Sequence, residues 1–345
     1  MSRLLGSRLP IVAAPMAGGG TTVALARAVA GAGGFPFLAA GYQTAEALAA
    51  QILELEAAGS PFGVNLFVPS AAAPDPAAFR QYAAELQPEA DVFGIELDPE
   101  PAVDDDAWAD KLALLLAHPV PVVSLTFGLP DPEDIAALRR AGSTVLASVT
   151  APDEAVAARE AGVDGLVVQG PDAGGHSAIF DPARPPAPRS TESLLAEVRA
   201  TVRLPLVAAG GVDGPEAVAR LLVAGADAVA IGTLLLRSDE AGTSATHRAA
   251  LADPADDRTV LTHAFTGRPA RALRNGFIAR HEATAPLGYP AIHHLTRPLR
   301  QAAGAAGDAE RLHLWAGTGY RAAPEGPVAE VIRWLASGVV TNGAE

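Results

Sequence analysis

The chain has 345 residues and a formal net charge of −14, from 39 acidic and 25 basic side chains. Because this negative field opposes anionic partners, we expect neither nucleic acid nor a membrane surface as a ligand. The chain has no cysteine, which excludes disulfides, thiolate catalysis and cysteine-ligated metals, and its 49% hydrophobic residues allow a large core.

The first residues make a poor signal peptide, because Pro10 and Pro15 interrupt the apolar stretch. Every apolar stretch of membrane-spanning length is broken by charge, Pro or Gly. We therefore expect a cytoplasmic protein, as a monomer or homodimer.

Short apolar runs alternate with Ala-rich stretches that are apolar at helical spacing. Helices are expected over 21–33, 44–59, 132–142, 151–162 and 214–227, most of them ending at a glycine. Eight strands are expected over 11–16, 35–40, 62–68, 120–127, 144–149, 165–169, 204–209 and 228–232. Strict alternation of strand and helix predicts a parallel sheet, because each helix returns the chain to the same end.

A ninth apolar run, 92–97, lies between an Ala-rich helix and an acidic loop, and we interpret it as a helix end and loop. The remaining eight strands predict a (β/α)8 TIM barrel of the α/β class. A ninth strand, or the loss of a weak one, would favour an open doubly wound sheet. The barrel is favoured because polar and Gly-rich residues recur after successive strands.

The alternation stops after Gly232, and 244–314 is rich in His and Arg without a strand repeat. We predict a small, mainly helical insertion domain over 244–314, near the C-terminus, that forms a lid over the barrel mouth. The barrel itself is predicted to comprise 1–243 and 315–345, with the apolar helix near the end packed back on it.

The residues just after each strand are the candidates for chemistry, because barrel active sites lie at the carboxyl ends of the strands. Gly210 and Gly211 follow the seventh strand, and Gly232 and Thr233 follow the eighth. Flexible backbone at these two turns predicts N–H groups that converge on a phosphate, although single turns of this kind also serve only to reverse the chain.

Asn65 and Gln169 end the third and sixth strands, and each amide both donates and accepts hydrogen bonds. A flavin pyrimidine edge requires that chemistry, and strand-end capping is the alternative. After the first strand, Gly18 allows the backbone to approach a planar ring, and Met16 offers a polarisable contact.

His176 stands on a loop directly after Gly174 and Gly175, where little side-chain bulk surrounds it. An imidazole has a pKa near neutrality and suits proton abstraction from a carbon acid beside a flavin. Asp172 either orients this imidazole or caps the turn.

Several motifs together resemble the nitronate monooxygenase family, formerly called 2-nitropropane dioxygenases, and they follow one another in order along nearly the whole chain. They are APMAGG (14–19), GVNLFVP (63–69), SLTFGLP (124–130), QGPDAGGHSA (169–178), PLVAAGGV (205–212), AIGT (230–233), FTGRPARALRN (265–275) and LWAGTG (314–319).

The resemblance implies non-covalent FMN and oxidation of alkyl nitronates, such as propionate 3-nitronate, by dioxygen to a carbonyl compound and nitrite. It implies that Met16, Ala17 and Gly18 face the flavin ring and that His176 is the base. The FMN contacts that it implies are Asn65, Gln169, Gly174, Gly211, Gly232 and Thr233. The family's histidine motif is often preceded by Glu and followed by Arg-Gly, whereas Asp172, Ser177 and Ala178 stand here.

Three other functions fit parts of the pattern. An FMN-dependent enoyl-acyl carrier protein reductase also has a Gly-Gly-His loop and would oxidise NAD(P)H. A flavin-free barrel lyase or synthase would use the two glycine turns for a phosphorylated substrate, and a binding protein would hold flavin without turnover. The other histidines lack metal-ligand spacing, so we predict no metal. We expect Arg268 and Arg271 to form salt bridges between lid and barrel, and contact with an anionic substrate is the alternative.

Overall fold

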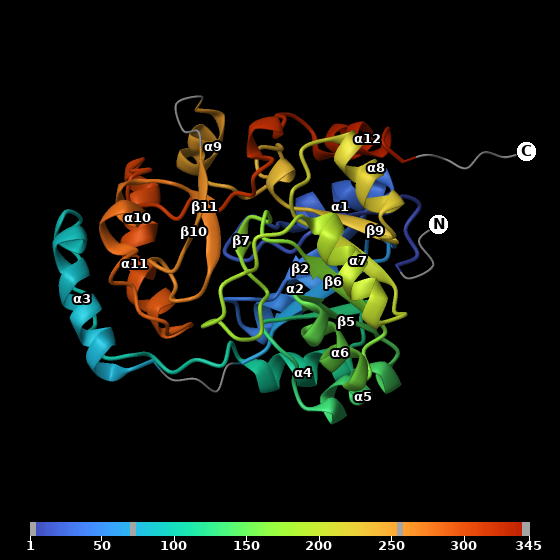
Figure 1. Ribbon diagram of the computed structural model, residues 1–345, viewed down its shortest axis with the longest axis horizontal. Coiled ribbons are helices and arrows are strands. Elements are labelled where there is room, and N and C mark those ends of the chain that lie inside the picture. The colour runs from blue at the N-terminus through green and yellow to red at the C-terminus, as the bar shows by residue number, and fades with distance from the viewer. Residues whose placement is uncertain (1–4, 70–73, 254–257, 340–345) are drawn as a thin grey trace, which may run out of the picture.

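Eight parallel strands close into a barrel in the order β1-β2-β3-β4-β5-β6-β8-β9 (Figure 1). The computed structural model describes residues 5–69, 74–253 and 258–339. The barrel strands are β1 (Ile11–Ala13), β2 (Phe35–Ala39), β3 (Gly63–Phe67), β4 (Val122–Thr126), β5 (Thr144–Val149), β6 (Gly165–Gln169), β8 (Leu206–Ala209) and β9 (Ala228–Ile231). The predicted TIM barrel is therefore confirmed.

Each of the eight predicted strand ranges contains one barrel strand, and β5 and β6 have the predicted bounds. Residues 92–97 form turn and loop, as predicted. The open doubly wound sheet is wrong, because β1 pairs in parallel with both β2 and β9 and so closes the ring.

The helices around the barrel begin and end where local chemistry favours it. Thr22 precedes α1 and accepts a hydrogen bond from Leu25 N at 2.9 Å, and Gly33 ends that helix with a left-handed φ of 99°. The helices in the barrel part of the chain are α1 (Val23–Ala32), α2 (Ala45–Glu56), α3 (Pro76–Asp91), α4 (Trp108–Ala117), α5 (Pro132–Ala141), α6 (Pro152–Glu160), α7 (Thr191–Thr201), α8 (Pro215–Val223) and α12 (Val328–Ala336).

Two apolar layers hold the barrel together. Side chains that point inward fill its interior, among them Phe35, Phe37 and Leu146, and Leu5 packs with them. A larger cluster joins the outer faces of the strands to the surrounding helices, including Ile332 of α12. The final helix therefore packs on the barrel, as expected.

The segment predicted as the lid, 244–314, contains helices α9 (Ala245–Ala252), α10 (Gly276–His281) and α11 (Ala291–Ala306), and we keep the name lid for it. It also contributes to a small sheet that the sequence pattern did not indicate. Strands β10 (Thr259–Thr262), β11 (Ala270–Leu273) and β7 (Gly175–His176) form this antiparallel sheet in the order β10-β11-β7. The two-residue strand β7 belongs to the loop after β6. Part of a barrel loop is thus hydrogen-bonded into the lid. Residues 254–257 of the predicted lid, and 1–4, 70–73 and 340–345 of the predicted barrel, lie outside the described residues.

Helix α3 lies beside α10 and α11 in Figure 1, away from the other helices of the first half of the chain. Its Phe79, Tyr82 and Leu86 share a core cluster with Phe265 and Ile292 of the lid. The helix that follows the third barrel strand is therefore part of the lid's packing.

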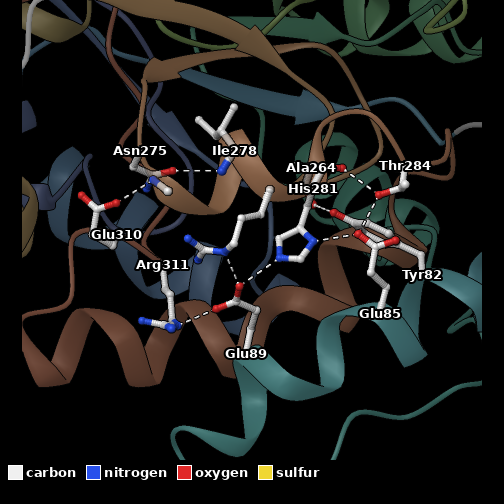
Figure 2. A network of polar contacts seen from close by, with 12 residues as sticks. Tyr82, Glu85, Glu89, Ala264, Asn275, Ile278, His281, Thr284, Glu310 and Arg311 are labelled. Carbon is white, nitrogen blue, oxygen red and sulfur yellow. Dashed lines mark hydrogen bonds and ion pairs between the residues drawn. The ribbon is translucent and has the colours of Figure 1, made fainter.

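Polar contacts also tie α3 to the lid, and Figure 2 shows them around Glu89. The Glu89 carboxylate accepts hydrogen bonds from Arg280 Nε at 2.6 Å and from Arg311 Nε at 2.7 Å, and His281 Nε2 lies 3.0 Å from it. Burial raises the pKa of Glu89, but the hydrogen bonds from Arg280 and His281 outweigh that effect and lower it to about 2.

In the part of the chain described, no helix is long and apolar enough to span a bilayer.

Candidate active site

One cavity of about 870 Å³ opens at the carboxyl ends of the barrel strands, beneath the lid. Every residue that the sequence proposed for the site lies in its wall: Met16, Ala17, Gly18, Asn65, Gln169, Gly174, Gly175, His176, Gly210, Gly211, Gly232 and Thr233. The fold thus brings loops from the ends of five strands to one place.

The glycine loops pack backbone against backbone on one side of the cavity. A Cβ on Gly174 would lie 2.4 Å from Gly317 N, and one on Gly210 would lie 2.9 Å from Ala173 N. Gly210 and Gly211 have left-handed φ values of 105° and 74°. These positions therefore require glycine, and the loops form a tight cradle.

Main-chain donors in this cradle are available to a ligand. Among the described residues, the N–H groups of Gly174 and Gly211 have no hydrogen-bond acceptor. The Thr233 hydroxyl lies beside Gly174, since a Cβ there would be 2.9 Å from Thr233 Oγ1, and it accepts a hydrogen bond from Gly317 N at 2.9 Å. Such convergent N–H groups fit a phosphate.

Asn65 is buried in the floor of the cavity at 3% exposure. Its Nδ2 has acceptors in Ser124 Oγ at 2.9 Å and Thr126 Oγ1 at 2.8 Å. The protein therefore fixes the orientation of the amide, and the carboxamide oxygen is left to accept a hydrogen bond from a ring N–H.

Gln169 also lines the cavity, but both ends of its amide bond to the loop that carries the histidine. Nε2 donates to the His176 carbonyl at 3.1 Å, and Oε1 accepts from Ala178 N at 2.7 Å. In this structure the side chain holds that loop in place, and its predicted contact with the cofactor stays a prediction.

Residues 16–21 form a closed turn at the end of β1. Met16 N donates to Thr21 Oγ1 at 2.9 Å, and Thr21 N donates to the Met16 carbonyl at 3.0 Å. Gly18 takes a left-handed φ of 82° within the turn. The turn places Met16, Ala17 and Gly18 together in the cavity wall.

His176 is enclosed by aromatic rings and has one polar side-chain partner. Its ring centroid lies 5.7 Å from that of Phe127, 5.5 Å from Tyr289 and 5.4 Å from Trp315. Its Nε2 lies 2.9 Å from Thr266 Oγ1 in the lid. Among the described residues, Thr266, and not Asp172, is therefore the residue whose side chain hydrogen-bonds to the imidazole.

Burial lowers the pKa of His176 to about 3, and the positive charges of Arg268 and Arg300 contribute to the shift. The imidazole is consequently neutral at physiological pH. A neutral ring has a free lone pair and can accept a proton.

Arg268 and Arg271 do connect the predicted lid to the loop after β6, but among the described residues they bond to carbonyl groups and not to the carboxylates that the predicted salt bridges require. Arg268 donates to the carbonyl of Ile179, and its guanidinium lies 4.1 Å from the Phe127 ring centroid. Arg271 Nε donates to the Pro171 carbonyl at 2.7 Å. Arg268 is thus a buried cation beside the aromatic wall of the cavity.

The sequence reasoning missed the face that helix α11 turns toward the cavity. His293, Arg297, Arg300, Gln301 and Gly304 all line it. The last four follow His293 by four, seven, eight and eleven residues, which places all five on one face of a helix. Such a stripe over a barrel mouth is a usable signal.

Two tyrosines were also missed. Tyr42 stacks on His293 with ring centroids 4.0 Å apart, and the Tyr289 hydroxyl donates to the Tyr42 hydroxyl at 3.1 Å. Tyr42 has a left-handed φ of 67°, which a single sequence does not reveal for a tyrosine.

Among the residues that line the cavity, Arg297, Arg300 and Asp172 carry the formal charges at neutral pH. Arg300 is 4% exposed and donates to the His293 carbonyl and to Thr296 Oγ1, without a carboxylate partner in the described part of the chain. The cavity is therefore positive in a protein whose net charge is −14. Glycine turns suited to a phosphate and a neutral imidazole around one positive cavity are features of an α/β-barrel enzyme that takes a phosphorylated ligand.

Comparison with known proteins gives the family. The sequence pattern of the nitronate monooxygenase family matches residues 2–338. The nitronate monooxygenase of Pseudomonas aeruginosa is 37% identical over 344 residues, which covers 97% of each chain. A probable nitronate monooxygenase of Staphylococcus saprophyticus is 35% identical and covers 92% of this chain and 91% of its own. The chain belongs to the nitronate monooxygenase family.

Solved structures agree with this assignment. The nitroalkane oxidase of Streptomyces ansochromogenes superposes with a TM-score of 0.92 at 47% identity, over 98% of this chain and 97% of that one. FabK of Thermotoga maritima superposes with a TM-score of 0.75 at 25% identity, over 97% and 94%. The protein is an FMN-dependent oxidoreductase, because FMN is the cofactor of the nitronate monooxygenase family.

The cavity fits this cofactor. The glycine cradle offers N–H groups for the phosphate, and the Asn65 oxygen offers an acceptor for the pyrimidine edge. The turn that carries Met16, Ala17 and Gly18 supplies an apolar wall. The assignment of individual contacts stays a prediction.

Proposed function

We propose that this enzyme oxidises alkyl nitronates, of which propionate 3-nitronate is an example, with dioxygen to a carbonyl compound and nitrite, and that His176 is its base. The observation that carries the proposal is a neutral imidazole in a positive cavity. When bound, FMN supplies the redox chemistry between the substrate and dioxygen.

The residues around the cavity suit a nitronate, which is an anion. Arg297 and Arg300 attract the negative charge, and Arg268 adds a positive charge near the imidazole. The aromatic side chains around His176 exclude water, which strengthens these interactions.

A neutral nitroalkane requires one further step, because it must lose a proton to become a nitronate. The C–H bond breaks, the proton moves to a ring nitrogen of His176, and the electron pair delocalises onto the nitro oxygens. Burial is the main cause of the low pKa of the free imidazole, and Arg268 and Arg300 add to it. These cations favour the nitronate anion, whose negative charge in turn favours the imidazolium beside it.

The deciding experiment has two parts. The purified protein is expected to show the visible absorbance of oxidised flavin, and to consume oxygen and release nitrite when a nitronate is added. Oxidation of NADPH with an enoyl thioester, without oxygen uptake on nitronates, would favour the reductase. A colourless protein that does not take up FMN would favour the lyase, and a flavoprotein without turnover on any of these substrates would favour a binding protein.

A further inference from the structure

The nitrogen of His176 that faces a ligand follows from the hydrogen bonds around Thr266. Thr266 is 1% exposed, and its Oγ1 lies 2.9 Å from His176 Nε2. A neutral imidazole has one N–H and one lone pair, so the role of this hydroxyl decides which nitrogen carries the proton.

The Thr266 hydroxyl has a second neighbour. Its Oγ1 donates to the Arg268 carbonyl at 3.4 Å, and no other donor within the described residues reaches that carbonyl. Arg268 is 1% exposed, and a buried carbonyl normally has a partner. The hydroxyl proton is therefore directed at Arg268, and the oxygen lone pair is left to accept a proton from His176 Nε2.

The other ring nitrogen, Nδ1, has no hydrogen-bond partner in the part of the chain described. The imidazole ring lies in the cavity wall and is surrounded by the rings of Phe127, Tyr289 and Trp315. These rings limit rotation of the imidazole, but within the described residues none of their side chains hydrogen-bonds to its nitrogens. Only the hydroxyl distinguishes one tautomer from the other.

The position of Thr266 is itself fixed by the lid. Thr266 N and Gly267 N both donate to the His263 carbonyl, at 3.1 and 2.7 Å. The neighbouring Phe265 carbonyl accepts from Thr296 Oγ1 of α11 at 2.5 Å. The turn that presents the hydroxyl is thus held by α11, the helix whose polar face lines the cavity.

We propose that Thr266 is a positioning residue that holds His176 as its Nε2–H tautomer, so that Nδ1 is the atom that accepts the substrate proton. In that arrangement the proton from the C–H bond goes to Nδ1, and Nε2–H donates to Thr266 throughout. The resulting imidazolium keeps this hydrogen bond, which becomes charge-assisted and stronger.

The first test measures the tautomer directly and does not depend on activity. In FMN-loaded protein with nitrogen-15 histidine, the nitrogen shifts and their couplings to the ring carbon-bound protons distinguish Nε2–H from Nδ1–H. The His176 signals are assigned by comparison with His176→Asn. We expect Nε2–H in the wild type, and in Thr266→Val a mixture or the other tautomer. An Nδ1–H tautomer in the wild type would overturn the inference.

The second test uses kinetics and rests on the proposed function. Thr266→Val keeps the shape of the side chain without the hydroxyl, and Thr266→Ser keeps the hydroxyl. For Thr266→Val we expect kcat/KM on neutral nitroethane to fall about 10–100-fold, while kcat/KM on pre-formed ethylnitronate changes less than about threefold. Thr266→Ser should restore most of the rate on nitroethane.

The results of these two tests separate the positioning role of Thr266 from the proposed function of the enzyme. Equal losses on both substrates, or a normal rate of Thr266→Val on nitroethane, would contradict a positioning role. If the wild type consumes no oxygen with any nitronate, the proposed function fails, whereas the tautomer spectrum still decides the role of Thr266. Retained flavin absorbance in each variant shows that the fold has survived.

Discussion

The Glu89 carboxylate is one part of the contact between α3 and the lid, and Glu89→Gln tests how much it contributes. The wild-type side chain is 9% exposed and meets three positively polarised groups, on Arg280, His281 and Arg311. Glutamine keeps the shape but removes the charge. Losing one partner of a buried ion pair costs about 3–5 kcal/mol. The Arg280 and Arg311 side chains are 45% and 25% exposed and can turn to water, so we expect about 2–3 kcal/mol.

Hydrogen exchange of α3 measures this local stability. A loss of about 2–3 kcal/mol corresponds to exchange about 30–150-fold faster for peptides that cover α3, in the regime where exchange follows the opening equilibrium. Glu100→Gln is the matched control, because it removes an exposed partner of Arg80 on the same helix, 3.0 Å from Arg80 Nε. We expect that control to change exchange by less than about threefold.

The contribution of Glu89 to stability should decrease as the pH is lowered. The pKa of Glu89 is lowered from 4.5 to about 2, so its contribution to stability is complete above about pH 4.5 and is lost as the pH falls toward 2. The difference between wild type and Glu89→Gln should therefore shrink below about pH 4.5. Equal exchange of α3 in the wild type and both variants at neutral pH would refute the reasoning.

Three further predictions concern the cavity. His176→Asn should retain FMN and lose about 10²–10⁴-fold in rate on neutral nitroalkanes, with a smaller loss on nitronates; an unchanged rate on nitroalkanes removes His176 from proton abstraction. Gly174→Ala should weaken FMN binding about 10–100-fold, because the new Cβ would lie 2.4 Å from Gly317 N. The control is Gly31→Ala, which has open space around it and should bind FMN normally. A fluorescence titration with FMN measures both variants. Burial lowers the pKa of His176 to about 3, so the imidazole should stay neutral between about pH 8 and pH 5. We therefore expect kcat/KM on nitroethane to show no fall near pH 6.5, and a fall centred near pH 6.5 would contradict the neutral imidazole.

The sequence was sufficient for the barrel because each of its strands is a short apolar run between helices, and that pattern is local. The site residues could be predicted for the same reason, since barrel chemistry lies at strand ends: Gly210 and Gly211 directly follow β8, and His176 lies in the loop after β6. The small sheet of the lid could not be predicted from the sequence. Its strands β10 and β11 have four residues each and contain Thr259 and Arg271, so they show no apolar run.

Contacts between residues far apart in the chain also could not be predicted from a single sequence. Helix α3 has an apolar stripe that fits a barrel helix as well as a lid helix, and only the fold shows that Phe79 packs with Phe265. The partner of His176 lies 90 residues away, and a threonine in a glycine-containing turn carries no mark of that role. Asp172 was the nearer candidate in the sequence, but distance along the chain does not measure distance in space.

The placement of His176 has a consequence for how the lid and the chemistry are coupled. The histidine follows a barrel strand in the sequence, but β7 pairs with β11 of the lid, where His176 is opposite Ala270. Ser177 N donates to the Pro269 carbonyl at 2.8 Å, and Thr266 contacts the imidazole from the same segment. The glycine cradle, in contrast, belongs to loops that follow β6, β8 and β9 of the barrel. A movement of β11 relative to the barrel would therefore move His176 relative to the cradle loops that follow β8 and β9. The distance between the proposed base and those two loops thus depends on the packing around β11 as well as on the barrel.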